Sequence, residues 1–221
     1  MKLNTVPQTG LLVSARQVAT CIFALAAILL VVSSSEAEDF LRWFSFWNSR
    51  ATSNFDALAI NGMPLYGYTA GEAKAAIDAL GYSTLPRKRF VKAQAIADAP
   101  GKNVWYSWTD GSETAIGYGG QILSMAEIPT GLHYKFVFLN ACWVGKQADN
   151  WKSAFGAEAF AGWNKRVENV IGRFPLFGRT VFEKLKGHVT VRDAIDAALS
   201  VVEGFKEEDM TVIGETVVVE K

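Results

Sequence analysis

Residues 134–145 read Tyr134-Lys-Phe-Val-Phe-Leu-Asn-Ala-Cys142-Trp-Val-Gly145, an apolar run that stops abruptly at its Asn-Ala-Cys end. A run that is apolar at nearly every position is typical of a strand buried on both faces, as in a parallel sheet. Ligands of open parallel sheets bind at the carboxyl ends of the strands. We therefore predict that Cys142 lies at such an end, which is where a nucleophile would be placed.

Short strand-like and helix-like segments alternate on both sides of this run. We expect further strands at 55–60, 82–85 (stopped by Pro86), 103–108 and 158–163, and a strand or hairpin in the tail at 210–219. Helices are expected at 69–80, 90–97, 151–155, 176–185 and after Thr190. This alternation predicts one α/β domain with a mainly parallel sheet flanked by helices. The glycines of segment 117–120 match no phosphate-binding loop, and we interpret them as loop geometry.

The first 37 residues are typical of an export signal. Lys2 and Arg16 precede an uncharged run at 18–32, and Ser35-Glu-Ala37 is a small-x-small cleavage pattern. As a helix, the run would be about 22 Å long, shorter than a hydrocarbon core of about 30 Å. A cleaved signal peptide at 1–37 is therefore our first interpretation, and an uncleaved membrane anchor through 18–32 is the alternative. Both export the remainder, so we expect a secreted, periplasmic or cell-surface protein.

The remaining chain is long enough for one globular domain. Residues 38–54 are predicted to be an aromatic-rich linker, and residues 55–221 the α/β domain. The formal net charge is zero, from 22 basic and 22 acidic residues, and Arg87-Lys-Arg89 is the largest basic cluster. Nucleic-acid binding is therefore not expected.

Cysteine usage leaves one thiol to explain. Cys21 lies within the apolar run, so removal of the signal would leave Cys142 as the only cysteine. An exported protein with one cysteine has a free thiol or a disulfide between chains. A buried cysteine that behaves as a small, inert hydrophobic residue is the alternative.

The order of these elements resembles the caspase–gingipain clan of cysteine peptidases, in its gingipain-like branch. In that clan a strand ending in His-Gly and a glycine-rich loop precede a buried strand ending in Asn/Asp-Ala-Cys. Here the corresponding segments are Trp108-Thr-Asp-Gly111 and Asn140-Ala-Cys142. Segments 154–163 and 182–194 and Ile213-Gly-Glu215 look like later elements of the clan. The resemblance covers roughly residues 55–219 and implies a caspase-like three-layer sandwich.

The resemblance also implies roles for three residues. Cys142 matches the nucleophile, and Gly111 matches the glycine whose amide would form an oxyanion hole with the amide of Cys142. Asp110, 32 residues before Cys142, falls at the position of the catalytic histidine. A carboxylate disfavours a neighbouring thiolate, and at neutral pH it has no proton to donate to a leaving amine. The acid–base chemistry of a peptidase is therefore missing from this position.

Two histidines could in principle replace the missing base. His133 precedes the Cys142 strand, about 25 Å from the thiol at roughly 3.3 Å per residue. His188 lies in the turn before the last helix; its approach to Cys142 is left open, and a capping or solvated role is favoured. A zinc site would also need carboxylates that no spacing singles out, so neither a metal nor another cofactor is expected.

These observations give three hypotheses of function. The first is an exported, catalytically degenerate peptidase-like module that binds or scaffolds a protein or peptide. The second is an active cysteine hydrolase that uses Cys142 with His188 or with Asp110. The third is a redox or intermolecular-disulfide role for Cys142, and the oligomeric state is left open.

Overall fold

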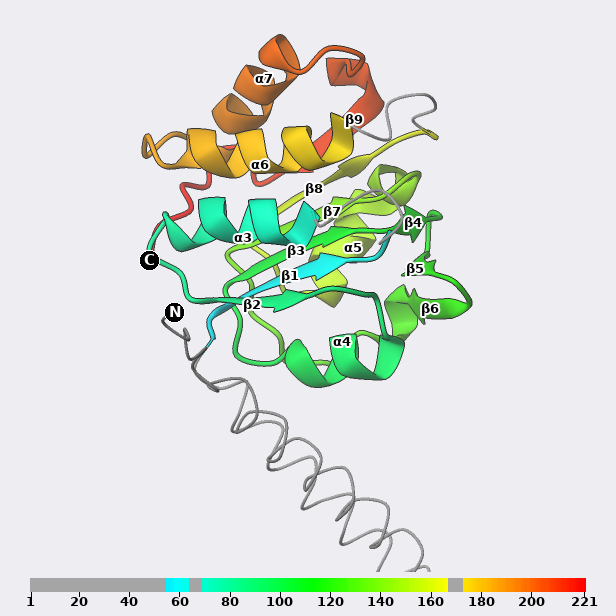
Figure 1. Cartoon of the computed structure of the whole chain (residues 1–221). Coiled ribbons are helices and arrows are strands. Elements are labelled where there is room, and N and C mark those ends of the chain that lie inside the picture. Colours follow the sequence, from blue (N-terminus) through cyan, green and yellow to red (C-terminus); the bar gives the residue numbers. More distant parts are fainter. Residues whose placement is uncertain (1–54, 64–68, 167–172) are drawn as a thin grey trace, which may run out of the picture. The chain divides into compact units, whose positions relative to one another are not determined.

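The computed structural model describes residues 55–63, 69–166 and 173–221 (Figure 1). The predicted signal or anchor at 1–37 and the linker at 38–54 lie outside the described residues. Within the described ranges, no helix combines the length and apolar character that crossing a membrane requires.

A six-stranded sheet forms the centre of the domain, in the order β2-β1-β3-β7-β8-β9 (Figure 1). Its strands are β1 (Ala57–Asn61), β2 (Thr84–Arg87), β3 (Val104–Trp108), β7 (Phe136–Asn140), β8 (Ala159–Trp163) and β9 (Met210–Ile213). The first five are parallel to their neighbours, and β9 pairs antiparallel with β8. The predicted α/β class with a mainly parallel sheet is confirmed.

Helices cover both faces of this sheet (Figure 1). One face carries α3 (Thr69–Asp78), α6 (Phe174–Leu185) and α7 (Val191–Val201), and the other carries α4 (Lys92–Asp98) and α5 (Ala148–Ala154). Because successive strand residues point to opposite faces, β3 feeds both cores. Tyr106 packs against Phe138 and Phe182 on one face, and Trp105 packs against Phe155 on the other.

A second, smaller sheet follows β3. It contains β4 (Asp110–Gly111), β5 (Ala115–Tyr118) and β6 (Gln121–Ser124), in that order and antiparallel. The interpretation of segment 117–120 as a loop was wrong in part. Gly117 lies within β5, and only Gly119 and Gly120, at φ angles of 60° and 82°, form the turn to β6. The described residues also form three short 3₁₀ helices: η2 (Met125–Glu127), η3 (Val144–Gln147) and η5 (Glu207–Asp209).

Several strand boundaries differ from those expected, most by one or two residues, and two of the differences have a clear cause. Pro86 was predicted to stop a strand but lies inside β2, opposite Ala59. Because β2 is at the edge of the sheet, a residue without an N–H is tolerated there. The tail strand ends at Ile213, not at 219, because Gly214 turns the chain with a φ of 75°. The helix predicted after Thr190 is confirmed as α7, and the Thr190 hydroxyl caps it by accepting a hydrogen bond from the Asp193 amide at 3.1 Å.

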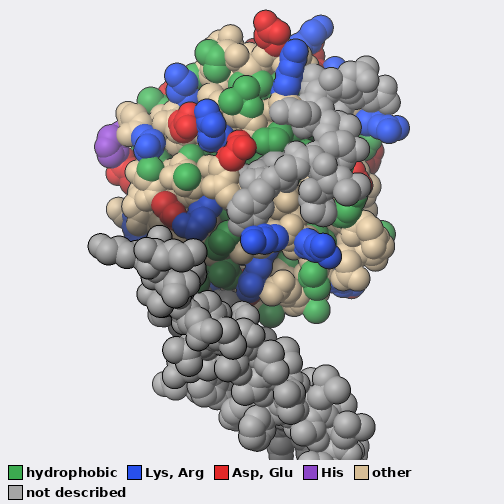
Figure 2. All heavy atoms as spheres, in the orientation of Figure 1, with side chains coloured by type: hydrophobic (Ala, Val, Ile, Leu, Met, Phe, Trp, Pro, Cys, Tyr) green, Lys and Arg blue, Asp and Glu red, His purple; other side chains and the backbone are tan. Residues whose placement is uncertain are grey.

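The surface carries charges of both signs. On the face shown in Figure 2, lysine and arginine side chains are interspersed with aspartate and glutamate. Arg192, for example, forms ion pairs with Asp196 and Glu215. Such mixing produces no extended field of one sign over the region of these pairs.

Candidate functional site

The predicted site residues meet at the carboxyl edge of the large sheet. Strands β3 and β7 are parallel neighbours whose last residues, Trp108 and Asn140, are register partners. Asp110 comes two residues after the end of β3, and Cys142 comes two residues after the end of β7. Asp110 is exposed, Cys142 is half-buried, and both line one cavity. The fold therefore brings together the two positions that the sequence had separated by 32 residues.

Gly111 packs directly against the backbone of Cys142. A Cβ atom added at Gly111 would lie 2.5 Å from the Cys142 carbonyl oxygen, 2.8 Å from the Ala141 Cβ and 3.2 Å from the Cys142 nitrogen. Only a residue without a side chain fits at this distance, so glycine is required here for close backbone approach. The structure thus places Gly111 against Cys142, and the oxyanion hole formed by their amides stays a prediction.

A buried hydrogen-bond network fixes the end of β7. The Asn140 side chain donates to the Tyr106 hydroxyl and to the Phe174 carbonyl oxygen, each at 3.1 Å, and accepts from the Trp163 indole at 2.7 Å. Burial holds the pKa of Tyr106 well above its ordinary value, so this hydroxyl stays protonated at neutral pH. Asn140 thus ties β7 to β3, β8 and α6 immediately before Cys142.

The turn after Cys142 has an unusual backbone. Trp143 has a φ of 67°, in the left-handed region that residues other than glycine adopt uncommonly. Its ring lies under the Lys146 ammonium, 4.4 Å from Nζ to the ring centroid, and Lys146 in turn pairs with Glu113 at 3.2 Å. These contacts connect the turn that follows the thiol to the loop between β4 and β5.

The cavity at this edge is small, about 110 Å³. Its lining comes from the ends of several strands and the start of α6, and comprises Met63, Trp108, Thr109, Asp110, Asn140, Ala141, Cys142, Arg166 and Phe174. Sequence analysis missed Arg166. The usable signal was its position shortly after β8, the strand next to β7, which places it at the same edge of the sheet. A cation and an anion, Arg166 and Asp110, therefore share the cavity with the Cys142 thiol.

Both histidines lie at the other end of the sheet. His133 precedes β7, as expected. His188 Nδ1 lies 2.7 Å from Glu220 Oε1, and the Glu220 carbonyl accepts a hydrogen bond from Tyr82, which precedes β2, at 2.6 Å. His188 is therefore beside the amino ends of the strands. The approach to Cys142 that the sequence left open is not made, and the His188 side chain is exposed and hydrogen-bonded to Glu220.

The described residues contain no group of three or more His, Cys, Asp and Glu side chains that could hold a metal ion. No protein-family model matches this chain, and no curated protein matches it significantly. The fold and the site therefore define a class of protein: an α/β domain with a mostly parallel sheet and a cysteine at its carboxyl edge.

Proposed function

We propose that this chain is an exported, caspase–gingipain-like domain that binds a peptide or protein segment without hydrolysing it. The observation that carries the proposal is the composition of the carboxyl edge. A carboxylate, Asp110, stands in the cavity beside Cys142 and Gly111, while His133 and His188 lie at the amino ends of the strands.

The chemistry of acyl transfer explains why this edge favours binding over catalysis. A thiol nucleophile needs a base to remove its proton and an acid to protonate the leaving amine. An ionised aspartate is a weak base and holds no proton, and its charge opposes a thiolate nearby. Arg166 supplies positive charge, but a guanidinium does not give up a proton in proteins. The carboxyl edge can therefore bind polar groups of a ligand without hydrolysing the ligand.

The size of the cavity supports recognition of a single side chain. Pockets for whole drug-sized ligands have about 300–1,000 Å³, and this cavity has about 110 Å³. A segment of peptide lying across the edge could place one side chain between Asp110 and Arg166. Partner identity is then set by one anchoring residue and by the surface around it.

The test introduces an imidazole at position 110, where the resembled clan has its catalytic histidine. We expect the full chain to resist labelling by peptidyl acyloxymethyl ketones and to leave fluorogenic peptides uncleaved. The variant Asp110→His should gain labelling at Cys142, because the imidazole supplies base and acid. Asp149→His, on the exposed start of α5, is the matched control and should gain none.

Two results would decide against the proposal. One is labelling of the unaltered chain that is lost in Cys142→Ala. The other is peptide cleavage by the unaltered chain at a rate similar to that of Asp110→His. Either would establish that the edge already contains a working base.

A thiol-reactive role is the second candidate, and the presence of Arg166 in the cavity favours it. A cation close to a thiol lowers its pKa and increases the thiolate fraction. If this role is correct, Cys142 reacts with iodoacetamide with an apparent pKa well below about 8.5, and Arg166→Gln raises that value. An unchanged pH profile in Arg166→Gln excludes activation by this residue.

A further inference from the structure

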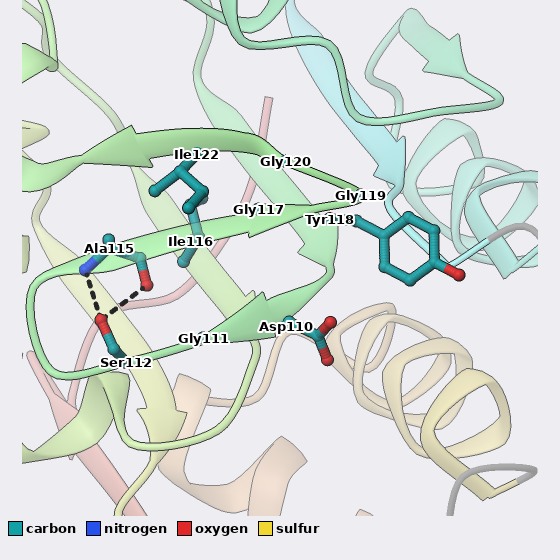
Figure 3. Close-up of a pocket in the computed structure, with 10 residues that line it drawn as sticks. All are labelled: Asp110, Gly111, Ser112, Ala115, Ile116, Gly117, Tyr118, Gly119, Gly120 and Ile122. Atoms are coloured by element: carbon teal, nitrogen blue, oxygen red, sulfur yellow. Dashed lines mark hydrogen bonds between the residues drawn. The ribbon is translucent and has the colours of Figure 1, made fainter.

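A second cavity, of about 290 Å³, lies on the three-stranded sheet (Figure 3). Ten residues of β4, β5, β6 and their connections line it: Asp110, Gly111, Ser112, Ala115, Ile116, Gly117, Tyr118, Gly119, Gly120 and Ile122. It shares Asp110 with the cavity at the carboxyl edge, but Cys142 is not among its lining residues. The cavity can therefore be occupied independently of the thiol.

One row of this sheet has a side chain at each end and none in the middle. Asp110 is the register partner of Gly117, and Gly117 is the register partner of Ile122. Residues directly opposite each other point to the same face, so a carboxylate and an aliphatic side chain flank a stretch of bare backbone. Gly117 cannot be replaced by a larger residue, because an added Cβ would lie 2.1 Å from the Gln121 carbonyl oxygen.

The charge of the cavity favours a cation. Of the ten lining residues, only Asp110 carries a charge. The acidic residues nearest in sequence, Glu113 and Glu127, are already paired with Lys146 and Lys92. In the part of the chain that the structure describes, no ion pair involves Asp110.

One further feature suits a cation that carries an alkyl chain. At the other end of the row, 58% of Ile122 is exposed, so its side chain is available to contact an alkyl chain. Two strand spacings, about 10 Å in all, separate the backbones of Asp110 and Ile122. A chain of four or five carbons would span the gap left between their side chains.

We propose that this cavity binds a primary ammonium group on a short alkyl chain. The ammonium binds Asp110, and the alkyl chain crosses Gly117 to contact Ile122. The same chemistry is present in a free aliphatic amine or diamine and in the side chain of a lysine. This site goes beyond the proposed peptide-binding edge, because it requires neither Cys142 nor Arg166.

Methyl NMR on the full chain tests the site directly. We expect 1-pentylamine to shift the Ile122 methyl signal with a dissociation constant in the range of about 1–10 mM, as suits a ligand of few atoms. The methyl signal of Ile195, a buried residue of α7, should not move. The neutral analogue 1-pentanol should bind at least about fivefold more weakly. Added salt should weaken the binding of the amine but not that of the alcohol.

Variants separate the contribution of the ammonium charge to binding from that of the alkyl chain. Asp110→Asn should weaken pentylamine at least about fivefold, whereas Glu113→Gln, an exposed acid outside the cavity, should leave it unchanged. From ethylamine to pentylamine, each added methylene should tighten binding about two- to fourfold. Ile122→Ser should reduce that dependence on length and keep the dependence on charge.

The outcomes are distinct. Absence of an Ile122 shift, or equal weakening by Asp110→Asn and Glu113→Gln, overturns the proposal. Binding of N-acetyl-lysine amide as tightly as pentylamine assigns the site to a protein lysine, and binding of free amines alone assigns it to small molecules. Cys142→Ala should bind pentylamine normally, so peptidase activity in the unaltered chain would refute the proposed function without affecting this site.

Discussion

The two ends of the large sheet carry different side chains that make different contacts. At the carboxyl end, Asp110 and Cys142 share a cavity and Gly111 holds two backbones in contact. At the amino end, His188 and Tyr82 both bind Glu220 and hold the tail in place. Both histidines are thus at the opposite end of the sheet from the thiol. The difference teaches that parallel strand ends bring separate segments of the chain together at one edge, whereas the contacts at the other edge anchor the tail.

The largest expected effect concerns Asn140, at the carboxyl end. Asn140→Ala leaves the Trp163 indole and the Tyr106 hydroxyl buried without this partner, and should lower the free energy of unfolding by about 3–5 kcal/mol. Urea unfolding measures it. Asn150→Ala, which removes only an exposed bond to Gln147, is the control and should cost less than about 0.5 kcal/mol. Similar losses in both variants would refute the structural role of the network.

The next effect compares a glycine at each end. Gly111→Ala drives a methyl group into the Cys142 backbone and should cost about 1–3 kcal/mol. At the amino end, a Cβ on Gly187 would lie 3.4 Å from its nearest neighbour, an ordinary contact. Gly187→Ala should therefore change the stability by no more than roughly 0.5 kcal/mol. The melting temperatures of the two variants measure this contrast, and equal values would contradict it.

The smallest effect concerns His188. Because its pair with Glu220 is exposed, His188→Ala should cost less than about 1 kcal/mol. Alkylation of Cys142 by iodoacetamide should proceed at the unaltered rate across pH 6–9, about the range in which histidine and cysteine titrate. A slower reaction in this variant would mean that the two ends communicate, and would remove the basis of the comparison.

Much of the fold could be predicted because it follows from local pattern. The apolar run before Cys142 and the alternating strands and helices were sufficient for the sheet and its direction. The errors lie where distant residues decide. Pro86 fits in a strand because β2 happens to be at the edge, and Gly117 lies in a strand because β6 pairs with it. Neither neighbour is visible in the local sequence.

The site shows the same division. The positions of Cys142, Asp110 and Gly111 just after strand ends could be predicted because each follows a recognisable strand, and the contact of Gly111 with Cys142 follows from adjacent strand ends. Arg166 was missed because it follows β8 without a motif of its own. The position of His188 depends on where the tail residue Glu220 returns, which is a contact over 32 residues.

Pro86 also affects how this protein behaves at high concentration. The edge strand β2 has four residues, one of which has no N–H, and the next, Arg87, is held by both carboxylate oxygens of Asp98 at 2.6 and 2.8 Å. A short edge with a proline and a charged, fixed neighbour offers an incoming strand few donors. Edge-to-edge pairing of sheets from different molecules into filaments is therefore disfavoured at β2. This edge strand is a local, identifiable source of the colloidal stability of the domain.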